Sequence, residues 1–154
     1  MVYWIIYFST KVLSFLFFPA TVYGQENIPK EGAFLLASNH VSYLDPMILG
    51  ITTGRRLNYM AKDTLFKGKF FGYVLPRLGA FPIKRYTGDT GALKECFRRI
   101  REGGPLLLFP EGTRHGAMEE KKALAGVGFL AQKANVPVVP VFIEGSQKDR
   151  KSTR

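Results

Sequence analysis

Apolar and polar positions along this chain form two kinds of segment. Short, nearly continuous apolar runs are flanked by glycine, proline or polar residues, and longer segments between them space their apolar residues three or four positions apart. Short runs bounded by turn residues are typical of buried strands, whereas the longer period is typical of amphipathic helices. Strands that alternate with helices of about 10–15 residues predict an α/β fold with a mainly parallel sheet flanked by helices.

The pattern predicts strands over residues 21–24, 33–38, 57–61, 80–85, 105–109 and 136–145. Helices are expected over residues 45–54, 63–77, 90–104 and 123–135, with residues 110–122 as a loop. Asp45 and Pro46 suit the N-cap and the first helical position of the helix at 45–54. The stretches 106–109 and 138–143 are apolar without alternation, which predicts strands covered on both faces.

The N-terminal segment is apolar on all sides. Besides Met1, it holds thirteen large apolar or aromatic residues before Pro19 and is interrupted by Lys11. No basic segment precedes this run and no small-x-small cleavage site follows it, which argues against a removable signal peptide. A membrane span needs about 20 apolar residues, and a central lysine is costly there. We therefore expect residues 1–19 to form a membrane-associated helix lying in the interface, with a buried core helix as the alternative, and residues 20–154 to form the α/β domain.

Composition and charge limit the kinds of molecule that this protein is expected to bind. A chain of 154 residues is about one domain, and its single cysteine, Cys96, favours a reducing compartment on the cytosolic side. The formal net charge is +10, and residues 55–101 hold twelve Lys and Arg against three Asp and Glu. Such a field attracts nucleic acid, anionic lipid or phosphorylated substrates. Because the N-terminus favours a membrane and no nucleic-acid-binding module is visible, we expect a membrane surface with anionic lipid and no nucleic acid.

A histidine and an aspartate follow the expected strand at 33–38. His40 and Asp45 lie in the stretch SNHVSYLDP, at the carboxyl end of a strand, where α/β sheets place their ligands. An aspartate that accepts a hydrogen bond from one ring nitrogen fixes the histidine tautomer, so that the other nitrogen takes a proton from a substrate hydroxyl. The alternative is that Asp45 and Pro46 only start a helix, with Ser42 as a capping partner. The spacing alone does not choose between the two.

Two further groups of residues suit an anionic ligand. Lys84 and Arg85 end the expected strand at 80–85, where two cations are able to bind phosphate. In the stretch FPEGTR, which follows the expected strand at 105–109, glycine permits close approach of the backbone, threonine offers a hydroxyl, and arginine binds phosphate in bidentate fashion. Taken alone, the two cations are equally explained as surface charge. An arginine in a turn is usually only exposed, and the glutamate could instead hold that arginine or a neighbouring loop in place. The residues of the second group are Glu111, Gly112, Thr113 and Arg114.

In combination, four motifs resemble those of a known family. They are N-H-x-x-x-x-D at 39–45, G-x-x-x-I-x-R at 79–85, F-P-E-G-T-R at 109–114 and V-P-V-V-P-V at 136–141. They occur in the order found in glycerolipid acyltransferases, and the chain is most similar to bacterial 1-acylglycerol-3-phosphate acyltransferases over residues 24–145. Four ordered motifs are far more specific than any one of them.

The resemblance implies transfer of a fatty acyl group from a thioester to the free hydroxyl of 1-acylglycerol-3-phosphate, which gives phosphatidic acid in phospholipid biosynthesis. His40 would be the general base and Asp45 its orienting partner, with no acyl-enzyme. Arg85 and residues 111–114 would bind the phosphate and glycerol of the acceptor. The donor would be acyl-CoA or acyl carrier protein, with no metal and no bound cofactor. Such a protein would be peripheral or monotopic at the cytoplasmic face of the cell membrane.

Two features depart from the family pattern. The family often has Phe-Ile and an acidic residue before the arginine of its second motif, whereas this chain has Pro82, Ile83 and Lys84, which leaves the acceptor headgroup open. The chain also stops soon after the fourth motif, which predicts a truncated or minimal member. The alternative functions are an acyltransferase or thioester hydrolase acting on another lysolipid, and a non-catalytic protein that binds anionic lipid.

Overall fold

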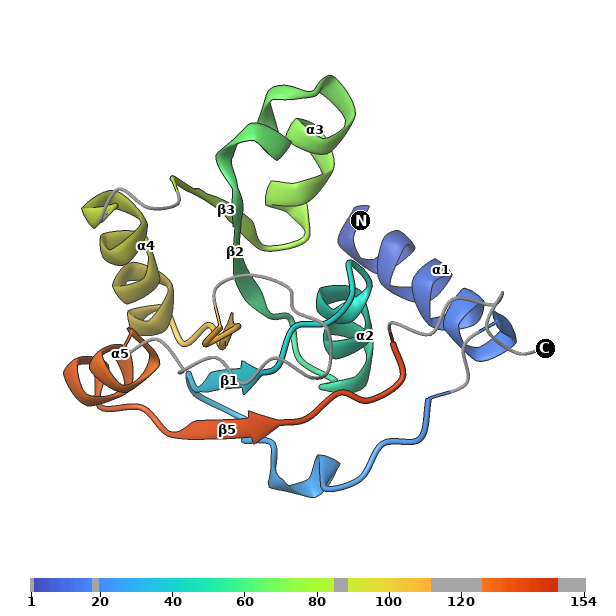
Figure 1. Ribbon diagram of the computed structural model, residues 1–154, viewed down its shortest axis with the longest axis horizontal. Helices are drawn as coiled ribbons and strands as arrows, with labels where there is room; N and C mark the ends of the chain where they lie inside the picture. Colours follow the sequence, from blue (N-terminus) through green and yellow to red (C-terminus); the bar gives the residue numbers. More distant parts are fainter. Residues whose placement is uncertain (1, 18–19, 85–88, 112–125, 147–154) are drawn as a thin grey trace.

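The computed structural model describes residues 2–17, 20–84, 89–111 and 126–146, and within them five strands form one parallel sheet (Figure 1). The order in the sheet is β3-β2-β4-β1-β5, and every strand pair in this part of the chain is parallel. The expected α/β fold with a parallel sheet is therefore confirmed. The strands are β1 (Leu35–Ser38), β2 (Asn58–Lys62), β3 (Ala80–Ile83), β4 (Leu106–Leu108) and β5 (Val138–Val141).

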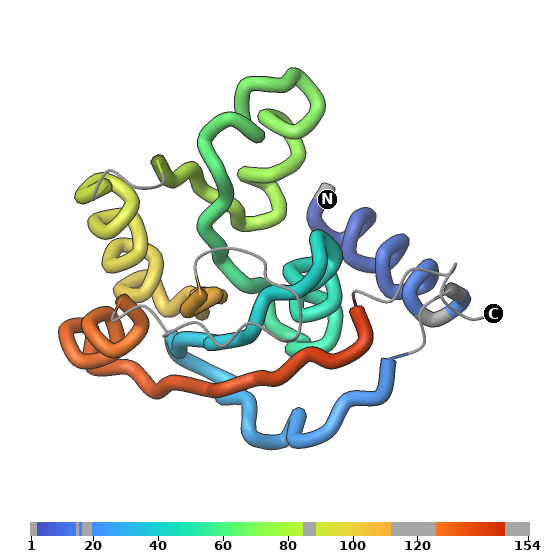
Figure 2. The backbone as a smooth tube through the Cα atoms, in the orientation of Figure 1, coloured from blue at the N-terminus to red at the C-terminus, as the bar shows by residue number. Residues whose placement is uncertain are grey.

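Helices cover both faces of the sheet. Helices α4 and α5 contact each other on one side, while α1 contacts both α2 and α3 on the other, as the path of the backbone shows (Figure 2). Two short 3-10 helices, η1 (Gln25–Asn27) and η2 (Asp63–Lys67), complete the described elements. The α-helices are α1 (Val2–Phe17), α2 (Asp45–Thr52), α3 (Lys69–Arg77), α4 (Thr90–Arg101) and α5 (Gly126–Ala134).

Two buried apolar clusters hold these layers together. Successive strand residues point to opposite faces of a sheet. Leu106 and Leu108 accordingly join the cluster beneath α4 and α5, while Leu107 between them joins the cluster that contains Leu49 of α2. All three leucines of β4 are buried, so the expectation of a strand covered on both faces is confirmed for residues 106–108.

The same expectation is wrong for residues 138–143. In the described part of the chain β5 lies at one edge of the sheet, and its residues are half-buried or exposed. Proline lacks the N–H that a central strand donates, so strands that contain it are found at edges. Pro82 in β3 and Pro140 in β5 occupy the two edge strands of this sheet.

Two other expected elements also differ. Residues 21–24 are exposed and form no strand, and Gly24 at their end has a φ of 73°, a left-handed conformation that suits a turn. The helix expected over 63–77 is divided at Gly68 into η2 and α3. These two segments pack closely, because a Cβ at Gly72 would lie 2.5 Å from the carbonyl oxygen of Phe66.

Helix α1 packs against the domain along one side. The Tyr7 hydroxyl donates to the carbonyl of Ile51 at 3.4 Å, and the Arg56 guanidinium lies 4.8 Å from the centre of the Tyr3 ring. Within the described residues, no helix combines the length and the apolar character that crossing a bilayer requires. The large apolar side chains that α1 exposes are Trp4, Ile5, Phe8, Val12, Leu13 and Leu16.

Candidate active site

The parallel strands β4, β1 and β5 lie side by side, so their carboxyl ends are at the same edge of the sheet. Helix α2 follows β1 on one face of the sheet, and α5, the next described element after the neighbouring strand β4, lies on the opposite face. Chain segments that leave neighbouring strands toward opposite faces open a crevice between them, which is where α/β proteins bind their ligands. His40 lies in this region, two residues after the end of β1.

His40 and Asp45 form a hydrogen-bonded pair at this position. The two side chains approach to 2.9 Å between Nδ1 of His40 and Oδ2 of Asp45, and their exposed fractions are 13% and 0%. An ionised carboxylate only accepts hydrogen bonds, so the imidazole donates from Nδ1. That tautomer carries its lone pair on Nε2, the atom able to take a proton from a hydroxyl.

The carboxylate of Asp45 also orders the loop that carries His40. Its Oδ2 accepts from the backbone N–H groups of Val41 at 2.8 Å and Ser42 at 2.7 Å. Helix α2 begins at Asp45, and its N-cap, Leu44, makes no side-chain capping bond. The prediction of Asp45 as the N-cap is therefore wrong, because its side chain bonds backward to the loop instead of to the first turn.

The pKa of Asp45 reflects two opposing causes. Burial raises the pKa of this carboxyl group, whereas hydrogen bonds from Ser146, Ser42, His40 and Val41 lower it. The hydrogen bonds prevail, and the pKa lies below the ordinary value for aspartate. Asp45 is consequently ionised at neutral pH, which keeps it an acceptor for His40.

Three residues outside the predicted pair complete its surroundings. Phe109, directly after β4, stacks on the His40 ring with centroids 4.0 Å apart and planes 19° apart. The Asn39 side chain donates to the carbonyl of Ile143 at 2.8 Å and accepts from its N–H at 2.7 Å. Ser146 donates its hydroxyl to Oδ1 of Asp45 at 2.7 Å. The segment after β5 thus holds the loop between β1 and α2 at two points.

The sequence indicates two of these three residues but not the third. Asn39 and Phe109 stand inside the first and third motifs, so their place beside His40 could have been read from the resemblance. Ser146 lies beyond the fourth motif and 101 positions from Asp45, and only the parallel arrangement of β1 and β5 brings them together. No local pattern indicates that contact.

Of the five residues predicted to bind the acceptor, the structure describes one. Glu111 is half-buried in the turn after β4, two residues beyond Phe109. Within the described residues, no three His, Cys, Asp or Glu side chains gather in a group able to hold a metal ion. The four that lie outside the described residues are Arg85, Gly112, Thr113 and Arg114.

A hollow of about 420 Å³ lies elsewhere, at the β3 edge of the sheet. Its lining includes Phe66, Phe81 and Asp89 but neither member of the histidine–aspartate pair. We assign the candidate active site by the pair's geometry, because the hollow contains no such arrangement.

Comparison with known proteins identifies the family of this chain. The model of the Acyltransferase family matches residues 19–144. The 1-acyl-sn-glycerol-3-phosphate acyltransferase of Bacillus subtilis is 31% identical over 138 residues, which cover 89% of this chain and 68% of that protein. The chloroplastic 1-acyl-sn-glycerol-3-phosphate acyltransferase BAT2 of Brassica napus is 30% identical over 135 residues, which cover 86% of this chain and 39% of that one.

A solved structure shares the fold over nearly the whole chain. The crystal structure of the 1-acyl-sn-glycerophosphate (LPA) acyltransferase PlsC from Thermotoga maritima superposes with a TM-score of 0.79 at 27% sequence identity. The alignment covers 99% of this chain but 61% of that chain, so this chain spans only part of the length of such relatives. Because the family model matches most of the sequence and the parallel sheet presents the motif's histidine and aspartate as a bonded pair, the chain belongs to the Acyltransferase family.

Proposed function

We propose that this protein transfers a fatty acyl group from an acyl thioester to the free hydroxyl of 1-acylglycerol-3-phosphate, producing phosphatidic acid. The observation that carries the proposal is the hydrogen bond between His40 and the buried, ionised Asp45 at the carboxyl edge of the sheet. Membership of the Acyltransferase family and relatives named for this reaction support the choice of substrate.

In the proposed mechanism, Nε2 of His40 takes the proton from the acceptor hydroxyl. The oxygen then attacks the thioester carbonyl carbon, the carbon–sulfur bond breaks, and the leaving thiolate recovers the proton from His40. Asp45 stabilises the imidazolium that forms in between, because its carboxylate is already ionised and bonded to Nδ1. A positioned general base of this kind accelerates a reaction by roughly 10²–10⁴-fold. Attack by the acceptor itself requires no acyl-enzyme, so Ser38 and Ser42 are not nucleophiles.

In this proposal, the basic and polar residues of the second and third motifs bind the phosphate of the acceptor. Arginine binds phosphate in bidentate fashion, and the glycine of a turn permits backbone N–H groups to approach it. The donor is acyl-CoA or acylated carrier protein. The proposed acceptor site consists of Arg85, Glu111, Gly112, Thr113 and Arg114.

The proposal places the protein at the cytoplasmic face of the cell membrane. Residues 1–19 form its membrane-associated element, supported by the row of apolar side chains that α1 exposes. A helix with such a face lies in the headgroup region and buries its apolar side chains toward the acyl chains. The net charge of +10 supports attraction to anionic lipid.

Release of free thiol tests the proposed function. Purified protein with lysophosphatidate and an acyl-CoA should release thiol, and His40→Ala should lower the rate by about 10²-fold or more. His115→Ala changes the chain's only other histidine and is the matched control, which should retain activity. Full activity of His40→Ala would refute the assigned base. Thiol release that needs no acceptor would identify a thioester hydrolase instead.

A further inference from the structure

Helix α3 and the preceding η2 expose large aromatic and aliphatic side chains to solvent. Phe70 is 70% exposed, and Phe71 and Tyr73 are each 53% exposed, while Leu65 of η2 is also exposed. Gly72 and Leu75, on the opposite side of the helix, are half-buried against the rest of the domain. Soluble monomers rarely expose contiguous apolar patches of this kind unless the patch binds something.

Cations border these side chains. Lys67 and Lys69 are exposed on either side of Gly68. The Arg77 guanidinium lies 3.5 Å from the centre of the Tyr73 ring, and its Nη1 donates to the Tyr73 carbonyl at 2.8 Å. Asp63 is the only acidic residue between positions 63 and 77. We call this set the α3 surface: Leu65, Lys67, Lys69, Phe70, Phe71, Tyr73 and Arg77.

The α3 surface begins at the same edge of the sheet as the active site. The strands are parallel, so η2 leaves β2 at the carboxyl edge, as the His40 loop leaves β1. Tyr43, between His40 and Asp45, is 81% exposed, and Phe142 directly after β5 is exposed at this edge as well. Helix α3 also contacts α1, and Figure 1 shows it beside the N-terminal end of that helix.

We propose that the α3 surface is a second membrane-contact surface, which binds anionic lipid headgroups and orients the carboxyl edge of the sheet toward the bilayer. Aromatic and aliphatic side chains enter the boundary between headgroups and acyl chains, and bordering cations pair with lipid phosphates. The same cations disfavour a second copy of this chain, since its α3 surface carries the same charge. The proposal adds an orienting contact to the membrane association in the proposed function, but it predicts binding rather than turnover.

Vesicle co-sedimentation tests the contact directly. Phe70→Ser with Phe71→Ser should weaken binding of the 154-residue protein about tenfold or more, both to vesicles of phosphatidylcholine and to vesicles that also contain phosphatidylglycerol. Lys67→Ala with Lys69→Ala should weaken binding by about tenfold on the vesicles that contain phosphatidylglycerol and leave binding to phosphatidylcholine unchanged. Phe129→Ser and Lys133→Ala, at exposed positions on α5, are the matched controls and should bind as wild type.

A fluorescence measurement reports insertion of the helix itself. Trp4 is the only tryptophan, so Trp4→Phe combined with Phe70→Trp places a single reporter on α3. Its emission should shift to shorter wavelength when vesicles containing phosphatidylglycerol are added. The absence of a shift, or unchanged binding by both double variants, would overturn the proposal. Concentration-dependent self-association that the Phe70 and Phe71 changes abolish, without loss of vesicle binding, would assign the surface to a second copy instead.

The result of the vesicle-binding experiments is independent of the result of the thiol-release test. His40→Ala should bind vesicles as wild type, because the histidine is 13% exposed and lies outside the α3 surface. A fully active His40→Ala would refute the proposed catalytic base and leave the vesicle results intact. Loss of thiol release in His40→Ala together with wild-type vesicle binding by the α3 variants would refute only the membrane contact.

Discussion

At the scale of single residues, the candidate site is organised around one carboxylate. Asp45 accepts hydrogen bonds from His40, from the N–H groups of Val41 and Ser42, and from the hydroxyl of Ser146. The two backbone donors lie in the loop between β1 and α2, so their bonds to Asp45 hold that loop in place. Ser146 instead lies after β5, the strand that neighbours β1 in the sheet. Ser146 is therefore a positioning residue, which holds Asp45 in the orientation that His40 requires.

Replacing Ser146 tests this role. Ser146→Ala should lower kcat for thiol release about tenfold, because a hydrogen bond to a charged group contributes about 1.5–3 kcal/mol. KM for the acyl donor should change little, and Ser146→Thr should restore most of the rate because it keeps the hydroxyl. A loss of activity matched by a loss of folded protein, with no rescue by threonine, would show a structural role only.

Single residues also show which contacts of the site are predictable from the sequence and which are not. His40 and Asp45 are five positions apart, so their pairing was predictable from a local pattern and the resemblance together. The helix start and the bonded pair do not exclude each other, because α2 begins at the residue whose carboxylate meets His40. Ser146 could not be predicted, because its contact depends on which strands lie side by side.

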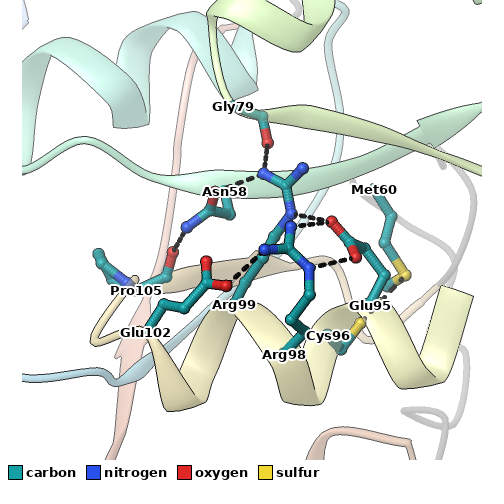
Figure 3. Close-up of polar contacts among 9 residues, drawn as sticks. All are labelled: Asn58, Met60, Gly79, Glu95, Cys96, Arg98, Arg99, Glu102 and Pro105. Atoms are coloured by element: carbon teal, nitrogen blue, oxygen red, sulfur yellow. Dashed lines mark hydrogen bonds and ion pairs between the residues drawn. The ribbon is translucent and has the colours of Figure 1, made fainter.

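At the scale of elements, a network of charged side chains on α4 connects this helix to the sheet (Figure 3). Arg98 and Arg99 both donate to Glu95, but their side chains are 48% and 18% exposed. Arg99 also donates to Oδ1 of Asn58 at 2.6 Å and to the carbonyl of Gly79 at 3.0 Å, and it lies 4.7 Å from the centre of the Phe81 ring. Arg99 thus links the helix to β2 and β3, whereas the described contacts of Arg98 are with Glu95 in α4 and with Glu102 directly after it.

The two adjacent arginines form a matched pair of variants. Arg99→Ala should lower the free energy of unfolding by about 3 kcal/mol, because it leaves the Asn58 and Gly79 acceptors without this donor. Arg98→Ala should lower it far less, because exposed ion pairs contribute little to stability. Urea unfolding of both variants measures the difference. Equal losses would contradict the link between α4 and the sheet.

Element prediction succeeded where local pattern decides and failed where neighbours decide. The strand in 33–38 and the amphipathic helix in 90–104 were predictable because each carries its own period and end signals. Residues 21–24 have strand-like composition but no partner strand in the described part of the chain. For 138–143, apolar composition suggested a central strand, although Pro140 was the available signal for an edge.

At the scale of the whole molecule, acid pH should lower the free energy of unfolding, because it protonates carboxylates that lie on separate elements. The pKa of Glu95 is lowered to about 2, chiefly by its hydrogen bond to Arg98, and the pKa of Asp45 is also below its ordinary value. A carboxyl group with a lowered pKa in the folded state stabilises the fold fully above its unfolded pKa and loses that contribution as pH falls through the folded value. The net charge of +10 at pH 7 becomes larger as carboxylates are protonated, and repulsion adds to the loss.

The free energy of unfolding should therefore decline steadily from about pH 5 to pH 2. Glu95→Gln removes one titrating group that bridges two arginines. Its deficit against wild type should be about 1 kcal/mol above pH 5, because solvent screens these charges, and should shrink toward zero near pH 2. Urea unfolding at a series of pH values measures both curves. A deficit that stayed constant from pH 7 to pH 2 would show that Glu95 stabilises the fold through packing rather than through its charge.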